Sequence, residues 1–226
     1  MGKMIELTAS DGHKLAAYRA DPTGTNAGKP RGAIVVIQEI FGVNSHIKAV
    51  TDGFAADGYL AIAPAMFDRV QKNFDVGYTP PDIEKGRELR AKITLDMAMK
   101  DAQAAIDAVK GAGKVGIVGY CWGGFVAWMA SAKLSGLSAA VPYYGGGILD
   151  NADIEPKVPV MAHFGEKDHM IPVDGVKKLA EKHKKHQVFI YAADHGFNCD
   201  HRGSYDAPSA KQARARTLEF FRKHIG

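Results

Sequence analysis

Hydrophobic positions along the chain follow two alternating patterns. Short runs of consecutive apolar residues, such as 33–37, are typical of strands buried on both faces of a sheet. Longer stretches with a helical period separate these runs. The pattern predicts strands at residues 5–8, 15–19, 33–37, 59–63, 114–118, 139–142, 158–164 and 187–192. It predicts helices at residues 44–57, 81–110, 125–133, 173–184 and 209–225, the second of them either continuous or broken in two near Lys92.

The order of these elements predicts an α/β fold, with residues 1–226 forming a single domain. Strands that alternate with helices form a mostly parallel sheet with right-handed crossovers, so we expect a central sheet of about eight strands flanked by helices. Ligands of such sheets bind beyond the carboxyl ends of the strands. Residues 67–81 have no clear period, and we expect this long loop to act as a lid or as a wall of a binding site.

The most informative motif is Gly119-Tyr120-Cys121-Trp122-Gly123-Gly124, between a predicted strand and a predicted helix. A nucleophile with small residues two positions before and after it, at a strand-to-helix turn, is a nucleophile elbow. The turn strains the backbone of the nucleophile, and the glycines let strand and helix approach closely. The usual nucleophile is Ser, and here it is Cys121. The alternative interpretation, a buried structural thiol, does not explain the surrounding glycines.

Cys121 needs a base to become a thiolate, and the base needs an acid that orients it. In α/β-hydrolases the nucleophile is followed along the chain by the acid and then by a histidine. Asp168 follows one predicted strand and His195 follows the last, so both occupy the expected positions. The alternatives are Glu166 as the acid, a turn-capping role for Asp168, and His163, His169 or His201 as the base.

An oxyanion hole at this site requires two backbone N–H groups. One belongs to Trp122, directly after the nucleophile, and the other is expected near Ile40, in the loop after residues 33–37. Glu39 lies in the same loop. From the loop alone, an exposed carboxylate in water is a more common interpretation than a functional one.

Charge and composition narrow the choice of partners. The chain has 29 Lys and Arg residues and 25 Asp and Glu residues, a net charge of +4, which weakly favours an anionic small-molecule substrate and gives no sign of nucleic acid binding. No run approaches the ~18 apolar residues that cross a bilayer, so we expect no membrane partner. Residues 1–6 lack the apolar core of a signal peptide, and Cys121 and Cys199 form no spaced framework. The expected location is therefore the reducing cytoplasm.

Five segments between about residues 34 and 200 share one resemblance. They are Gln38-Glu39-Ile40-Phe41-Gly42-Val43-Asn44, residues 113–124 around the elbow, Tyr143-Tyr144-Gly145, Gly165-Glu166-Lys167-Asp168 and His195-Gly196-Phe197. Together they resemble the dienelactone hydrolase family of α/β-hydrolases. The resemblance implies the single-domain α/β-hydrolase fold and a triad of Cys121, His195 and Asp168, with no metal and no organic cofactor. It also implies that Glu39 meets the resting thiol and takes part in its deprotonation when substrate binds.

The reaction that this resemblance implies is hydrolysis of an enol-lactone, such as dienelactone to maleylacetate, or of a small ester. The thiolate of Cys121 would attack the carbonyl, and the amides of Trp122 and Ile40 would hold the oxyanion. Water assisted by His195 would then release the product from a thioester. Tyr144 matches a pocket tyrosine of the family.

The sequence departs from the family where a substrate carboxylate would bind. The family has an arginine four residues after the triad histidine, and this chain has Cys199 there, which cannot bind an anion as a guanidinium does. The second family arginine falls within residues 84–90. The candidate substrate-binding cations are Lys85, Arg87, Arg90 and Arg202.

Two other classes of function remain compatible with the sequence. In one, the chain is a thiol redox or sensor protein in which Cys121 is oxidised reversibly, with Cys199 as its partner in space. In the other, it is a non-catalytic binding protein on a hydrolase fold. A monomer and a homodimer are equally compatible with the sequence.

Overall fold

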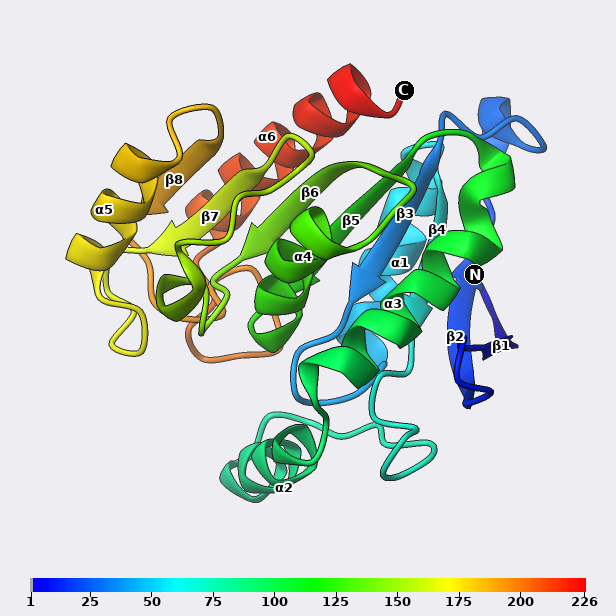
Figure 1. The fold of residues 1–226 in the computed structure, drawn as a ribbon, viewed down its shortest axis with the longest axis horizontal. Coiled ribbons are helices and arrows are strands. Elements are labelled where there is room, and N and C mark those ends of the chain that lie inside the picture. Colours follow the sequence, from blue (N-terminus) through cyan, green and yellow to red (C-terminus); the bar gives the residue numbers. More distant parts are fainter. Residues whose placement is uncertain (1) are drawn as a thin grey trace.

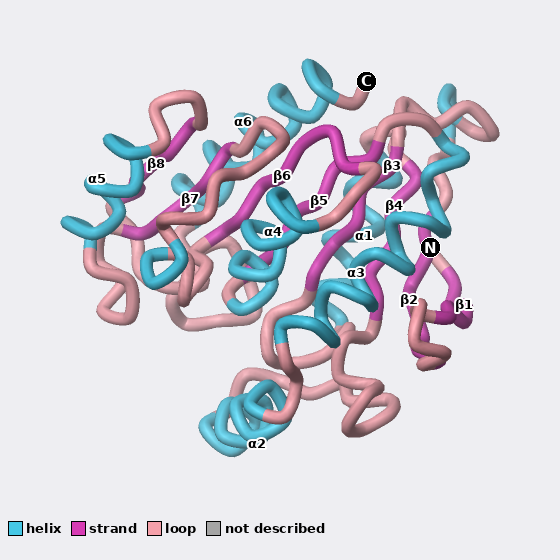
Figure 2. The backbone as a smooth tube through the Cα atoms, in the orientation of Figure 1, coloured by secondary structure: helices cyan, strands magenta, loops and turns pink. Residues whose placement is uncertain are grey.

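The computed structural model describes residues 2–226, and its strands form one eight-stranded sheet in the order β1-β2-β4-β3-β5-β6-β7-β8 (Figures 1 and 2). The strands are β1 (Lys3–Thr8), β2 (Lys14–Ala20), β3 (Ala33–Ile37), β4 (Leu60–Pro64), β5 (Val115–Tyr120), β6 (Leu137–Tyr143), β7 (Met161–Gly165) and β8 (Gln187–Tyr191). The α-helices are α1 (Ser45–Ala56), α2 (Pro80–Ala91), α3 (Leu95–Val109), α4 (Trp122–Lys133), α5 (Val173–Lys182) and α6 (Ala207–His224).

The predicted mostly parallel sheet of about eight strands is confirmed. Each neighbouring pair from β4 to β8 in the sheet order is parallel, whereas β2 pairs antiparallel with both β1 and β4. The carboxyl ends of β3, β5, β7 and β8 therefore meet at one edge of the sheet, where the candidate residues follow them.

Helices cover both faces of the sheet and bury its central strands. Every residue of β3, β4 and β5 is buried, as their continuous apolar runs predict. In Figure 1, α3 and α4 lie in front of the sheet and α1 and α6 lie behind it. The two rear helices touch through Phe54 and Phe221, whose ring centroids are 6.0 Å apart. The carboxyl ends of the strands, which the candidate residues follow, are thus held by a close-packed core.

The predicted helical stretch 81–110 is broken in two. It divides into α2 and α3, because the side chain of Thr94 accepts a hydrogen bond of 3.2 Å from the amide of Met97 and begins a new helix. The first helix begins with a capping box between Thr79 and Asp82. The break lets α2 leave the face of the sheet and lie beyond the carboxyl end of β3 (Figure 1).

The long loop of residues 67–81 packs against the loop that follows β3. The amide of Val76 donates to the carbonyl of Phe41 at 3.2 Å, and Asn44 Nδ2 donates to the carbonyl of Val76 at 3.1 Å. Because these hydrogen bonds tie the two loops together, the long loop supports Glu39 and Ile40 from outside.

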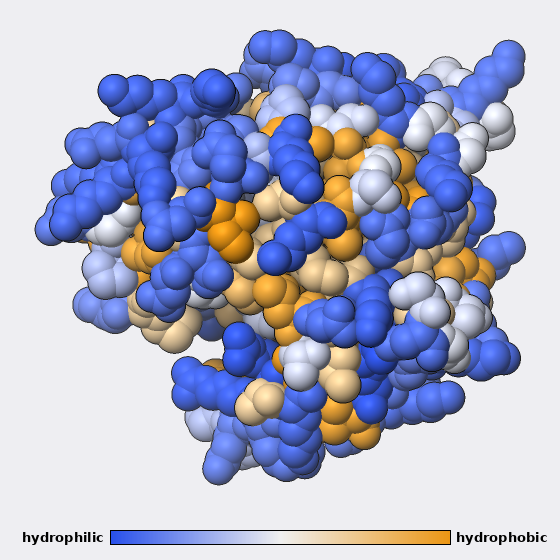
Figure 3. Space-filling view, viewed as in Figure 1, coloured by the Kyte–Doolittle hydropathy of each residue, from blue (hydrophilic) through white to orange (hydrophobic). Residues whose placement is uncertain are grey.

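Hydrophilic residues form most of the periphery of the face seen in Figure 3, with apolar residues across its middle. Among residues 2–226, no helix is both long and apolar enough to cross a membrane.

Candidate active site

Cys121 lies in the strained turn between β5 and α4. Its backbone has φ 55° and ψ −119°, a left-handed conformation that non-glycine residues rarely adopt. The glycines make this turn possible, because a Cβ at Gly119 would lie 1.9 Å from the carbonyl oxygen of Gly123. A Cβ at Gly123 would lie 2.4 Å from the carbonyl oxygens of Ile37 and Gln38, at the end of β3. The turn therefore presents the thiol at the carboxyl end of the sheet.

Three side chains from three different strand ends form one chain of hydrogen bonds. His195 Nε2 lies 3.2 Å from Cys121 Sγ, and His195 Nδ1 lies 2.7 Å from Asp168 Oδ2. Asp168 and His195 are buried, whereas Cys121 is partly exposed. The other carboxylate oxygen of Asp168 accepts a hydrogen bond of 2.9 Å from the amide of Met170. Asp168 therefore caps its turn and orients the imidazole at the same time.

The charges around His195 favour its protonated form. Burial alone would lower the pKa of His195, but the thiolate of Cys121 and the carboxylate of Asp168 raise it from its usual value to about 10. An imidazolium beside Cys121 stabilises a thiolate, which is the nucleophilic form of cysteine.

Two backbone amides, those of Trp122 and Ile40, are the candidates for an oxyanion hole. Trp122 is the first residue of α4, so its amide is one of the N–H groups that a helix leaves unpaired. Ile40 lines the same pocket as Cys121. Within residues 2–226, neither amide donates a hydrogen bond. The carbonyl of Ile40 faces α2, where a Cβ at Gly86 would lie 2.2 Å from its oxygen.

Glu39 is buried and bound on both carboxylate oxygens. Its Oε1 accepts a hydrogen bond of 3.0 Å from Arg202 Nη1, and its Oε2 accepts one of 3.2 Å from the hydroxyl of Tyr78. Burial works against the charge of Arg202, but Glu39 and the thiolate of Cys121 outweigh it and raise the pKa of Arg202. Arg202 therefore lies within electrostatic reach of both the nucleophile and Glu39.

A pocket of about 350 Å³ opens over Cys121 and His195. Of the four candidate cations, Arg202 and Arg87 line it. Lys85 instead pairs with Glu88 at 2.9 Å on the exposed side of α2, and Arg90 is also exposed. Neither of these two is among the described residues that form the pocket wall.

Tyr144 lies behind His195 and is fully buried. Its ring centroid is 5.2 Å from that of His195, and its backbone has φ 34°. Its hydroxyl has no hydrogen-bond partner within residues 2–226. The ring of Tyr144 therefore supports the imidazole from the inside of the molecule.

The alternative acid and bases occupy other surroundings. Glu166 is exposed, and the buried His163 is bound to Tyr191 at 2.8 Å and Thr217 at 3.1 Å. His169 is an exposed residue at the pocket, and His201 is an exposed neighbour of Asp200. None of the four is hydrogen-bonded to Cys121 among the residues described.

Sequence reasoning missed Tyr78, His46 and Gly86. Tyr78 lies in the loop before α2, and His46 lies in the first turn of α1. Neither residue belongs to a motif, and no hydrophobic period predicts its contacts. Gly86 has one readable signal, a glycine inside an otherwise helical pattern, which often marks a close approach. Cys199, which carries no family role, is fully buried beside Glu39 and Tyr78, and both cysteines are free.

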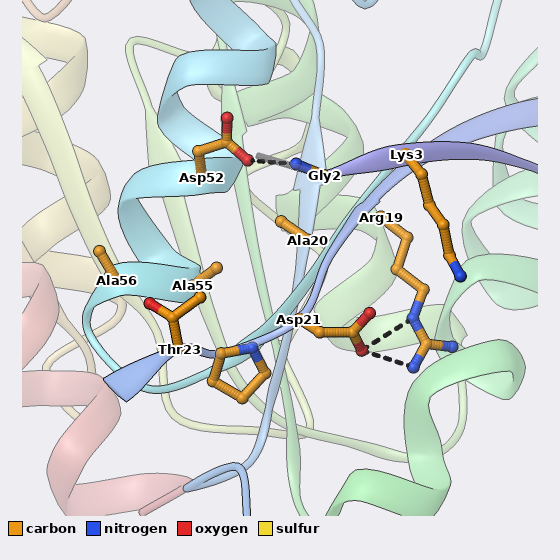
Figure 4. A pocket seen from close by; sticks show the side chains of 10 residues that line it. Gly2, Lys3, Arg19, Ala20, Asp21, Thr23, Asp52, Ala55 and Ala56 are labelled. Atoms are coloured by element: carbon orange, nitrogen blue, oxygen red, sulfur yellow. Dashed lines mark hydrogen bonds and ion pairs between the residues drawn. The ribbon is translucent and has the colours of Figure 1, made fainter. Parts of the chain in front are cut away.

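A larger hollow of about 440 Å³ lies elsewhere, beside β1, β2 and α1 (Figure 4). Among its charged groups, Arg19 pairs with Asp21 at 2.7 Å, and Asp52 accepts a hydrogen bond from the amide of Gly2. It holds no nucleophile beside a base, so the smaller pocket over Cys121 is the better candidate for chemistry.

The sheet order, the strained cysteine between β5 and α4 and the hydrogen-bonded histidine and aspartate define an enzyme of the α/β-hydrolase class. The pattern of the dienelactone hydrolase family matches residues 15–225. The chain belongs to this family.

Individual relatives agree with this assignment. A Synechocystis protein named "Putative carboxymethylenebutenolidase" is 34% identical over 232 residues, covering 94% of this chain and 93% of the relative. An Escherichia coli protein of the same name is 32% identical, covering 96% of this chain and 85% of the relative. The crystal structure of a "Putative Dienelactone Hydrolase" from Klebsiella pneumoniae has a TM-score of 0.84 and 30% identity, covering 98% of this chain and 100% of that one. This chain is therefore a hydrolase of lactones or esters.

Proposed function

We propose that the chain opens an enol-lactone of the dienelactone type, or cleaves a small ester, by nucleophilic attack of Cys121. The observation that carries the proposal is the hydrogen-bond chain from Cys121 through His195 to Asp168, with distances of 3.2 and 2.7 Å. In such a chain of hydrogen bonds the histidine can act as a base toward the cysteine, and the aspartate can orient the histidine, as covalent catalysis requires. The name of the relatives supports the same substrate class.

In the first half of the reaction, Cys121 Sγ bonds to the lactone carbonyl carbon. The oxyanion accepts hydrogen bonds from the amides of Trp122 and Ile40, which donate to no other group within residues 2–226. The ring C–O bond then breaks to leave a thioester, and His195 Nε2–H gives its proton to the departing enol oxygen.

In the second half, water attacks the thioester and His195 accepts its proton. The C–S bond breaks, the thiolate of Cys121 leaves, and the new carboxylic acid departs with the enol, which becomes a ketone in solution. Asp168 keeps Nδ1 protonated throughout, so Nε2 always faces the reacting atoms.

Glu39 and Arg202 supply a link between substrate binding and activation. Glu39 accepts only one N–H group of Arg202, so a substrate carboxylate that binds the guanidinium through two N–H groups can draw Arg202 away from Glu39. Glu39, once released, accepts the proton of Cys121 in those molecules in which the sulfur is still a thiol, and so completes the ionisation that the protonated His195 favours. Arg87, on α2, is the second cation that reaches the pocket.

The test of the nucleophile is the hydrolysis of dienelactones, other lactones and simple esters by the wild type, Cys121→Ser and Cys121→Ala. We expect Cys121→Ala to lose about 10³-fold or more in kcat/KM on every substrate that the wild type turns over. Unchanged hydrolysis by Cys121→Ala would exclude the mechanism.

The test of the carboxylate site compares Arg202→Gln and Arg87→Gln with the matched control Arg90→Gln. Loss of a charge-assisted hydrogen bond costs about 1.5–3 kcal/mol, so KM for a carboxylate-bearing lactone should rise roughly 10- to 100-fold in Arg202→Gln. KM for a neutral lactone should change little, and Arg90→Gln should resemble the wild type. An equal rise for charged and neutral substrates would contradict the role of Arg202.

A further inference from the structure

Three side chains of metal-binding type converge in the interior beside the pocket. Glu39, His46 and Cys199 each place one ligand atom within 4.8 Å of the other two. Their exposed fractions are 1%, 3% and 0%. They come from the loop after β3, the first turn of α1 and the segment between β8 and α6. Residues so distant along the chain meet here only through the fold.

His46 presents a buried nitrogen with nothing to bind. Its Nδ1 lies 3.2 Å from Asp200 Oδ1, so a proton on Nδ1 donates to that carboxylate and Nε2 keeps its lone pair. Nε2 is buried and has no hydrogen-bond partner among residues 2–226. A buried polar atom without a partner destabilises the fold, and a ligand at that atom would remove this cost. Burial also lowers the pKa of His46, which favours the neutral imidazole that binds metals.

We propose that Glu39, His46 and Cys199 form a binding site for a divalent cation of the zinc class. Carboxylate oxygen, imidazole nitrogen and thiolate sulfur are the three ligand types that zinc takes from proteins. Asp200 supplies the carboxylate that a metal-binding histidine holds with its other nitrogen. Zinc bonds of about 2.0–2.3 Å place neighbouring ligand atoms roughly 3.5 Å apart, so atoms that lie within 4.8 Å of one another need to close by up to about 1.3 Å. Side-chain rotation of Glu39 and Cys199 can supply this movement.

Binding releases one proton. Burial raises the pKa of Cys199 to about 12, so without a cation its thiol keeps the proton. A coordinated thiol is deprotonated by the charge of the ion, and the proton passes to solvent. His46 and Asp200 also line a hollow of about 350 Å³ between α1 and α6, so the proposed site lies next to a space open to solvent.

The site competes with the contacts of Glu39. The ion must displace at least one of the hydrogen bonds that Glu39 accepts from Arg202 and Tyr78. Bound zinc would then hold Glu39 away from Cys121 and inhibit hydrolysis. This inhibitory effect rests on the proposed function, whereas the binding of the ion does not.

Another cluster, Glu155, His183 and His186, does not fit a metal in the same way. His186 Nδ1 accepts a hydrogen bond of 3.2 Å from the amide of Val160. In the neutral ring of His186, Nε2 therefore carries the proton and the lone pair of Nδ1 is taken by the amide of Val160. His186 thus has no lone pair left for a metal ion.

The test uses Co²⁺, whose absorption in the near ultraviolet reports a bond to thiolate. Cys121→Ala removes the other thiol, so in this background only Cys199 can produce the band. We expect Cys121→Ala to bind one Co²⁺ ion and to show the absorption band of a cobalt–thiolate bond. The band should disappear when Zn²⁺ is added, because Zn²⁺ displaces Co²⁺. Cys121→Ala/Cys199→Ser should lose the band, and Cys121→Ala/His46→Gln should bind Co²⁺ roughly 10- to 100-fold more weakly or not at all. Near-ultraviolet circular dichroism without metal verifies that each variant is folded.

His201→Gln in the same background is the matched control. His201 forms an exposed cluster with His46 and Asp200, and its loss should leave the band unchanged if the ion binds at Cys199. Absence of the band in folded Cys121→Ala, or its persistence after Cys199→Ser, overturns the proposal. So does a band that requires Cys121, because the ion would then bind at Cys121 and His195.

Activity separates the two claims. Zn²⁺ should inhibit lactone hydrolysis by the wild type at least 10-fold more strongly than hydrolysis by Cys199→Ser. The cobalt band in Cys121→Ala together with equal inhibition of both enzymes would support the site and overturn the inhibitory effect through Glu39.

Discussion

Arg202 Nη1 donates a hydrogen bond of 3.0 Å to Glu39 Oε1, across 163 positions of the sequence. The carboxylate is 1% exposed and the guanidinium side chain 19% exposed, so the pair is largely shielded from water. It connects the loop after β3 with the segment before α6. Both segments border the pocket, so this contact affects the stability and the function of the site together.

Removal of one member of this pair should destabilise the fold. Arg202→Met leaves the charge of Glu39 buried without its cation, and we expect the free energy of unfolding to fall by about 3 kcal/mol. Urea denaturation measures the change. The double variant Glu39→Gln/Arg202→Met should regain most of the loss, because no unpaired charge remains. Lys85→Met breaks the exposed pair with Glu88 and should change stability by less than about 0.5 kcal/mol. Equal effects of the two single variants would contradict this interpretation.

Gly86→Ala should slow catalysis by moving Ile40. A methyl group at residue 86 would lie 2.2 Å from the carbonyl oxygen of Ile40, so α2 or the loop has to shift. A shift of about 1 Å in a catalytic group can cost on the order of 100-fold in rate, so we expect a fall in kcat of about 10- to 100-fold. Gly111→Ala is the control, since no heavy atom lies within 4 Å of a Cβ at that glycine. Steady-state kinetics should find the Gly111 variant unchanged, and a wild-type kcat for Gly86→Ala would exclude the contact as a positioning element.

Alkylation of Cys121 should depend little on pH near neutrality. Because the pKa of His195 is raised to about 10, the ring beside Cys121 stays an imidazolium between about pH 6 and pH 9, and its charge favours the ionised form of the neighbouring sulfur over that whole range. Iodoacetamide should therefore react with Cys121 at nearly the same rate over this range. In His195→Asn no imidazolium is present, and an ordinary thiol with a pKa of about 8.5 loses reactivity as pH falls. Mass spectrometry of the alkylated peptide gives both rates, and parallel pH profiles would contradict the ion pair.

Asp168→Asn should preserve the fold and lose most of the activity. The amide can still cap the turn at Met170 through its oxygen, but it favours the wrong tautomer of His195 and does not stabilise the imidazolium. We expect kcat to fall by on the order of 10³- to 10⁴-fold with KM little changed. Glu166→Gln, on the exposed side of the same loop, should retain wild-type kinetics. The opposite ranking of these two variants would reassign the acid.

Much of the architecture could be predicted from the sequence, because apolar runs and turn residues act locally. The run at residues 33–37 became β3 with the predicted bounds, since five consecutive apolar residues require burial on both faces. The positions of Cys121, Asp168 and His195 were readable for a related reason. Parallel strands bring their carboxyl ends to one edge, so residues that follow different strands become neighbours whatever lies between them. The sequence between α2 and α3 suits either a continuous helix or a capped restart, and only the structure shows that Thr94 begins a new helix.

The sequence by itself determined the order of strands and helices along the chain, a mostly parallel sheet of about eight strands, and the strand ends that a cysteine, an aspartate and a histidine follow. Only the tertiary structure decided which cations reach the pocket, and it placed Arg202 and Arg87 there while Lys85 and Arg90 stayed outside. It also brought Cys199 to Glu39 and His46, a contact that no motif marks. The physical reason is that these side chains come from loops and helix ends, whose contacts depend on packing between distant segments and on no local period.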